Sequence, residues 1–97
     1  MKLINAEIKN SLPKLSEQES KGINTIAYVK FFTPDSSWTW YATEFDGEDI
    51  FFGLVDGFVK ELGYFSLSEL ESARGPLGLK IERDLYFEPT TLKELMK

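Results

Sequence analysis

Carboxylate, lysine, tyrosine and serine side chains are the groups of this sequence that could carry out chemistry. Its 97 residues include no His and no Cys. Their absence excludes imidazole bases, thiol nucleophiles and the nitrogen or sulfur ligands of most transition-metal sites. Sixteen acidic residues could serve acid–base hydrolysis, but their spacing singles out no catalytic pair. We therefore expect no catalytic residue, no cofactor and no metal, and the sequence leaves enzymatic activity undecided.

Four acids crowd around one predicted turn, Asp46-Gly47: Glu44, Asp46, Glu48 and Asp49. Carboxylate oxygens suit Ca²⁺ or Mg²⁺, which take several oxygen ligands. The segment lacks the alternating ligands and terminal Glu of an EF-hand loop. A solvated turn that keeps the hairpin soluble is therefore the favoured interpretation, and a cation site is the alternative.

The two arginines of the chain, Arg74 and Arg83, flank the segment GPLGL. Such a pair could hold a carboxylate or phosphate through bidentate hydrogen bonds. With nearby carboxylates, the arginines could line a small-ligand pocket or a hydrolase site. Structural ion pairs with Glu82, Asp84 or Glu88 are the favoured alternative, because no Gly-rich phosphate loop leads into a helix here.

Aromatic side chains make up 14% of the chain and are its most distinctive feature. On a strand from 38 to 45, alternation places Trp38 and Trp40 on one face, with Tyr41 and Phe45 on the other. A single sheet with one helical layer buries only one face well. The remaining rings could form a patch that binds a partner. The alternative is that helices or a long loop cover the second face.

The net charge of −5 arises in the middle of the chain. Residues 31–59 contain no base and six acids: Asp35, Glu44, Asp46, Glu48, Asp49 and Asp56. This charge disfavours the nucleic-acid backbone, including base stacking on the rings, and favours basic partners. An acidic surface could also imitate DNA and inhibit a nuclease or regulator of the anti-restriction type.

Strands and short helices must position these residues. β-Branched and aromatic runs bounded by turn residues predict strands at 26–32, 38–45, 50–55, 58–65 and 81–87, the last at an edge. The dipeptides Asp46-Gly47 and Asp56-Gly57 predict hairpins. The beginning of the fourth strand could instead be helical.

Helix-capping patterns predict two or three short helices. One begins after Asn5, one runs from Ser66 to Ala73, and a frayed turn follows Thr91. Residues 14–24 are expected to be a loop. The fold class is therefore α+β, with a single antiparallel sheet of four to five strands in one domain, residues 1–97.

The location of the protein is expected to be cytoplasmic. The N-terminal segment MKLINAEIKN has no apolar run of signal-peptide length. No stretch approaches the roughly 18 consecutive apolar residues of a membrane span. We expect no membrane partner, and the oligomeric state stays open.

Six segments resemble one small bacterial family, domain of unknown function 2958. They are YVKFFTPDS at Tyr28–Ser36, WTWYATEFDGED at Trp38–Asp49, FFGLV at Phe51–Val55, ELGYFSLSELES at Glu61–Ser72, RGPLGL at Arg74–Leu79 and IERDLYF at Ile81–Phe87. The resemblance implies a link to bacterial plasmids and integrated mobile elements. It also implies an accessory role, and it supplies no catalytic residue.

A non-catalytic protein-interaction module is the predicted function. Its partner is expected to be a protein, met through exposed rings rimmed by acids. The predicted contact residues are Trp38, Trp40, Tyr41, Asp46, Glu48 and Asp49. The alternatives are the Arg74/Arg83 ligand pocket or hydrolase and the acidic DNA mimic.

Overall fold

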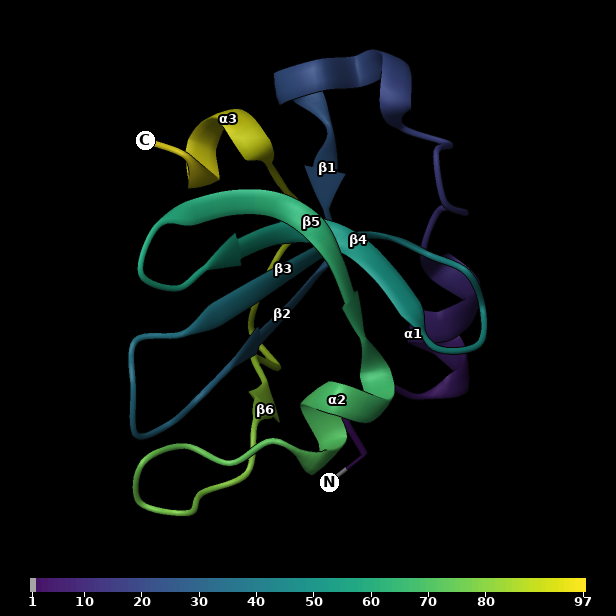
Figure 1. Cartoon of the computed structure of the whole chain (residues 1–97). Helices are drawn as coiled ribbons and strands as arrows, with labels where there is room; N and C mark the ends of the chain where they lie inside the picture. The colour runs from purple at the N-terminus through teal and green to yellow at the C-terminus, as the bar shows by residue number, and fades with distance from the viewer. Residues whose placement is uncertain (1) are drawn as a thin grey trace.

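Five strands form one antiparallel sheet, in the spatial order β5-β4-β3-β2-β6, in the computed structural model, which describes residues 2–97 (Figure 1). The strands are β2 Val29–Phe32, β3 Thr39–Phe45, β4 Ile50–Asp56, β5 Lys60–Ser66 and β6 Glu82–Arg83. Strands β2 to β5 are each neighbours of the next, so they form the predicted meander of hairpins. The α+β class and the edge position of the last strand are confirmed.

A second sheet and four short helices complete the fold of residues 2–97. In this sheet β1 (Ile26–Ala27) pairs antiparallel with β7 (Thr90–Thr91). The helices are α1 (Ala6–Ser11), the 3-10 helix η1 (Glu19–Asn24), α2 (Leu67–Ser72) and α3 (Leu92–Leu95). Within the described residues, no helix has the length and apolar composition needed to cross a membrane.

Side-chain caps begin each α-helix where the sequence predicts a helix start. The side chains of Asn5, Ser66 and Thr91 accept hydrogen bonds from the backbone N–H three residues later, over 2.9, 3.1 and 3.4 Å. These bonds satisfy N–H groups that have no partner inside the helix. The three helices therefore follow from local sequence.

The chain before β2 is more structured than its polar composition predicts. Residues 14–24, expected to be a loop, contain η1, in which Gly22 takes a left-handed φ of 55°. The expected strand at 26–32 is split, because β1 pairs with β7 whereas β2 pairs with β3. The physical reason is Gln18, whose buried side chain bonds both the N–H and the carbonyl of Ile26.

The predicted strand at 81–87 is wrong beyond its first residues. Only β6 pairs with β2 there. After it, the Asp84 side chain accepts a hydrogen bond from Tyr86 N and the Asp84 carbonyl accepts one from Phe87 N. These bonds turn the backbone away from the extended form, so the strand ends.

One face of the sheet carries the main core. Phe51 is fully buried, and its ring lies 4.4 Å from that of Phe45 and 5.3 Å from that of Phe65. The core cluster also contains residues from the N-terminal segment, from α2 and from the chain before β6: Leu3, Leu12, Leu70 and Ile81. Figure 1 shows α1 and α2 on this side of the sheet.

The opposite face is covered at its centre. Leu54 faces away from Phe51 and is fully buried. Leu92 of α3 is also buried and lines a pocket together with Phe52 and Leu62 of this face. Figure 1 shows α3 and β1 on the side of the sheet away from α2. The sequence left open that helices or a loop cover the second face. At the centre of the sheet they do.

A β-bulge changes which rings share a face. The β3–β4 register shifts between Ala42 and Glu44. An extra residue reverses the alternation beyond it, so Phe45 joins the core face with Trp40 while Tyr41 stays on the other. The prediction that Tyr41 and Phe45 share a face is wrong for this reason.

Candidate functional site

The six predicted contact residues lie in three places. Trp38 lies just before β3 and Trp40 is its second residue, whereas Asp46, Glu48 and Asp49 follow its end. The strand has seven residues, so about 20 Å separate the two regions. Tyr41 lies on the opposite face of the sheet from Trp40. The structure therefore does not assemble the acids and the tryptophans into one surface.

The acidic turn uses two of its carboxylates to hold the backbone. Asp46 Oδ1 accepts hydrogen bonds from the N–H groups of Glu48, Asp49 and Ile50 over 2.8 to 3.0 Å. Asp49 accepts two bonds from Ser68, at the start of α2. Within residues 2–97, no three acidic side chains gather closely enough to hold a metal ion. The turn therefore connects β3 to β4 with its own backbone held by Asp46, and Asp49 attaches it to the start of α2.

Replacing Asp46 with Asn should destabilise the protein at neutral pH but much less in acid. The N–H groups of Glu48, Asp49 and Ile50 lower the pKa of Asp46 below its ordinary value of 3.8. A lowered folded-state pKa stabilises the fold above pH 3.8, and this stabilisation disappears as the pH falls through the folded-state value. Urea midpoints at neutral and acidic pH measure the effect. A wild-type advantage that stays constant with pH would contradict it, and Glu48→Gln is the matched control.

Tyr41 packs into the second face and not onto a contact surface. Its ring lies 5.8 Å from the ring of Phe87, and Lys30 Nζ stands 5.9 Å from its centroid. Burial raises the pKa of the Tyr41 phenol above its ordinary value, and the carboxylates of Asp56 and Asp84 add to the rise. The side chain is therefore a neutral aromatic group at neutral pH.

Three rings form an aromatic cluster at the end of the sheet that carries the β2–β3 and β4–β5 turns. In this ring cluster, the Trp38 ring centroid lies 6.0 Å from that of Trp40 and 5.4 Å from that of Phe58, with the Trp38 and Phe58 rings in a T-shaped arrangement. Trp40 packs against the core, whereas Phe58 is 94% exposed. The Trp38 ring occupies the space that a side chain at Gly57 would need. The cluster thus runs from the core into solvent.

A groove of about 630 Å³ lies beside the ring cluster and also takes in Arg74, Pro76 and Ile81. Its far wall is the loop after α2, which Asp35 fixes by accepting a hydrogen bond from Leu77 N at 2.7 Å. Gly75 packs against the same carboxylate, with no room there for a side chain. The rings and the loop are therefore held as one surface.

The two arginines do not converge on a common site. Arg74 Nη1 donates to the carbonyl of Ala73 at 2.8 Å, and Arg83 Nη1 donates to the carbonyl of Leu3 at 2.6 Å. Arg74 lines the groove beside the rings, whereas Arg83 lines a different pocket. Within residues 2–97, neither arginine forms an ion pair with a carboxylate. They bind backbone carbonyls instead of the acids that the sequence favoured.

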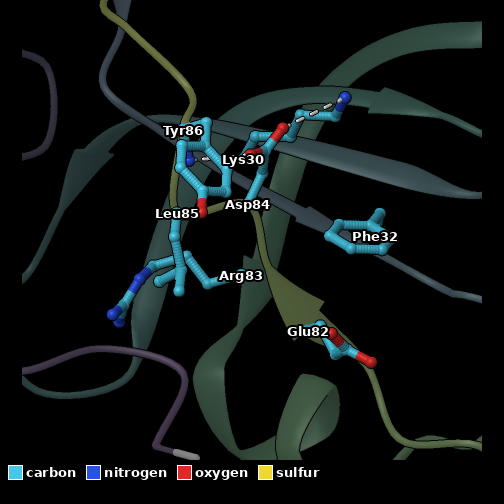
Figure 2. Close-up of a pocket in the computed structure, with 7 residues that line it drawn as sticks. All are labelled: Lys30, Phe32, Glu82, Arg83, Asp84, Leu85 and Tyr86. Atoms are coloured by element: carbon cyan, nitrogen blue, oxygen red, sulfur yellow. Dashed lines mark hydrogen bonds and ion pairs between the residues drawn. The ribbon is translucent and has the colours of Figure 1, made fainter.

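The pocket beside Arg83 is shown in Figure 2 and has a volume of about 320 Å³. Lys30 and Asp84 form an ion pair of 3.7 Å at one side of it. Tyr86 stands 91% exposed, and the Arg83 guanidinium extends away from Lys30 (Figure 2). Lys30 and Asp84 are paired with each other and Arg83 donates to a backbone carbonyl, so these three charged groups do not converge on the pocket.

A third hollow lies on the second face, against the outer strand β5. This β5 pocket has a volume of about 440 Å³ and is lined by residues from η1, β3, β4, β5 and α3. Glu44 lines it while only 4% exposed, and its two oxygens accept hydrogen bonds from Ser16 N and Gln18 N at 2.8 Å each. The β5 pocket thus combines apolar walls with a buried carboxylate.

Sequence reasoning identified Trp38 and Trp40 but missed Phe58 and the β5 pocket. Phe58 follows a predicted Asp-Gly turn, so its exposure at a hairpin tip could have been anticipated from the turn. The β5 pocket had no local signal, because its walls come from segments that are far apart in the sequence.

The comparisons with known proteins give one match. The model of the family described as "Protein of unknown function (DUF2958)" matches residues 3–95. The comparison with curated proteins and the comparison with solved structures each gave no match.

Proposed function

The chain belongs to the family described as protein of unknown function (DUF2958), and from this premise we propose that it is a non-catalytic domain that binds a protein partner. The single observation that carries the proposal is the 94% exposure of Phe58. A large ring held in solvent gains no burial energy in the free protein, but it gains that energy when a partner covers it.

The setting of Phe58 supports a contact role. Its ring is placed by Trp38, which is in turn placed by Trp40 and the core. The contact with Trp38 restricts the Phe58 ring, and a ring that is already restricted loses less conformational entropy on binding. Aromatic side chains of this kind are enriched among the residues that dominate interface energies. Trp38 and Trp40, with Phe58, are therefore proposed as the partner-binding residues.

The β4–β5 turn and the loop across the groove extend the proposed surface. Val59 follows Phe58 in the β4–β5 turn, and Leu77 and Leu79 are exposed in the loop across the groove. Leu62 and Tyr64 are also exposed, but they line the β5 pocket on the second face. Apolar side chains that are exposed beside a groove are typical of sites that bind other molecules. Of the remaining predicted residues, Tyr41 lies on the opposite face and the acidic turn lies at the opposite end. We therefore leave these residues outside the proposed surface.

The alternatives receive less support. The acids of residues 31–59 are spread over both ends of the sheet and its interior, where Glu44 is buried, so they form no continuous array like the phosphates of DNA. The arginines bind carbonyls in separate places. An accessory role in mobile elements, implied by the family resemblance, suits a domain that acts by binding.

Phe58→Ala should abolish capture of the partner while leaving the fold intact. An exposed ring contributes little to folding, whereas a central interface ring contributes about 2 kcal/mol or more to binding. The measurement is affinity capture from the native host with tagged wild type and variant, quantified by mass spectrometry and checked by circular dichroism.

Tyr86→Ala is the matched control, because Tyr86 is similarly exposed but lies beside β6. We expect this variant to retain the partner that Phe58→Ala loses. Equal capture by wild type and Phe58→Ala would overturn the proposed surface.

A further inference from the structure

Strand β5 is the long free edge of the main sheet. It has seven residues, whereas β6 at the other edge has two. Gly57 N donates to Val59 O and Leu67 N to Asp49 O, which fixes the hydrogen-bonding pattern of the β4–β5 pair. In an antiparallel pair, alternate residues bond to the partner strand. Given the register of β4 and β5, the backbone N–H and C=O groups of the odd-numbered β5 residues bond to β4. The N–H and C=O groups of Leu62 and Tyr64 therefore point away from the sheet.

An outward-pointing row of backbone groups is a template for another strand. Side chains opposite Leu62 and Tyr64 on an added strand would point to the same face as those two residues. That face holds the β5 pocket, which Leu62 and Tyr64 both line while remaining 48% and 67% exposed. A strand added at this edge would therefore direct alternate side chains at the pocket.

The residues that line the β5 pocket favour a positively charged side chain. Glu44 and Glu19 line it, and no Lys or Arg does. Each Glu44 oxygen accepts one backbone N–H, so each keeps a lone pair for a further donor. The rings of Phe52 and Tyr64 stand 5.0 Å apart at the same pocket, and ring faces attract cations. Apolar walls suit the aliphatic stem of a long basic side chain.

We propose that an extended segment of a partner protein adds to β5 as a further strand and inserts a Lys or Arg side chain into the β5 pocket. This inference rests on the proposed function and specifies the form of the partner. The charge of the pocket, the free backbone edge and the exposed apolar side chains all favour the same occupant. Phe58 of the ring cluster lies two residues before β5, at the same end of the strand as the β4–β5 turn.

The test uses the full chain, labelled with ¹⁵N, and synthetic heptapeptides as probes. The first probe is acetyl-Thr-Val-Thr-Lys-Thr-Val-Thr-amide, and in two others norleucine or glutamate replaces the lysine. We expect the lysine peptide to shift the amide signals of Leu62 and Tyr64, with affinity about tenfold higher than that of the norleucine peptide, which lacks the cation. Equal binding of the three peptides, or no shift in β5, would overturn the inference.

Two variants test the edge and the pocket separately. Tyr64→Lys places a positive charge at the pocket mouth and should lower the affinity for the lysine peptide about tenfold. Tyr86→Lys should leave this affinity unchanged. Leu62→Pro removes an outward N–H that the sheet does not use and should abolish strand addition. If Leu62→Pro unfolds, the effect of Tyr64→Lys on binding of the lysine peptide still tests the proposal.

A second copy of this chain is the competing occupant. Sedimentation of the wild type should give a monomer, and a dimer that Leu62→Pro disperses would overturn the inference. Failure here is distinguishable from failure of the proposed function. If Phe58→Ala loses its partner while β5 does not respond to the peptides, the proposed function stands and this inference falls.

Discussion

Phe51→Ala should lower the free energy of unfolding by about 3–5 kcal/mol. Phe51 is fully buried between three stacked or tilted rings, those of Phe31, Phe45 and Phe65, whose centroids lie 4.4 to 5.5 Å from its own. Removing the ring loses its burial energy and leaves a cavity that three rigid neighbours cannot fill. Because domains of this size are stable by only about 5–15 kcal/mol, the variant should be close to unfolding.

Urea denaturation followed by circular dichroism measures this loss. Phe52→Ala is the matched control, because Phe52 is the next residue of β4 but is only half-buried on the second face. We expect Phe52→Ala to lower the free energy of unfolding clearly less than Phe51→Ala does. A loss below about 1 kcal/mol for Phe51→Ala would mean that the ring stack is not the centre of the core.

Gln18→Ala should lower the free energy of unfolding by roughly 2–4 kcal/mol, the second-largest expected effect. The Gln18 side chain is buried and bonds the N–H and carbonyl of Ile26 and the carbonyl of Thr43, over 2.8 to 2.9 Å. Truncation leaves these backbone groups buried without partners. The cost of such groups exceeds the net gain of an ordinary hydrogen bond.

Amide hydrogen exchange reports the local consequence of Gln18→Ala. Exchange at Ile26 should accelerate more than exchange at Phe51, because the substitution loosens η1 and β1 before the main sheet. Glu17→Ala, one residue away and exposed, should change neither. An unchanged rate at Ile26 would show that the side chain does not hold β1.

The parts of the fold that depend on local sequence could be predicted. The caps at Asn5, Ser66 and Thr91 act within three residues, and the Asp46-Gly47 turn is fixed by bonds inside the turn. The hairpin strands followed from their β-branched and aromatic runs. These features need no knowledge of the rest of the molecule.

The parts that depend on contacts between distant segments could not be predicted. The bulge before Glu44 places that carboxylate against the N–H groups of Ser16 and Gln18, more than 25 residues away in the sequence. The same bulge reverses the face of Phe45. Asp35 fixes Leu77 across 42 residues. No local pattern marks such pairs, so the β5 pocket and the groove emerge only from the assembled structure.

We propose that this domain binds a protein partner through the ring cluster, with Phe58 at its exposed end. Site-specific photocrosslinking in the native host tests it most directly, with p-benzoylphenylalanine in place of Phe58 and, in a second strain, of Tyr86. The account predicts one dominant crosslinked protein from position 58 that is absent from position 86. The same crosslinks from both positions, or none from position 58, would contradict it.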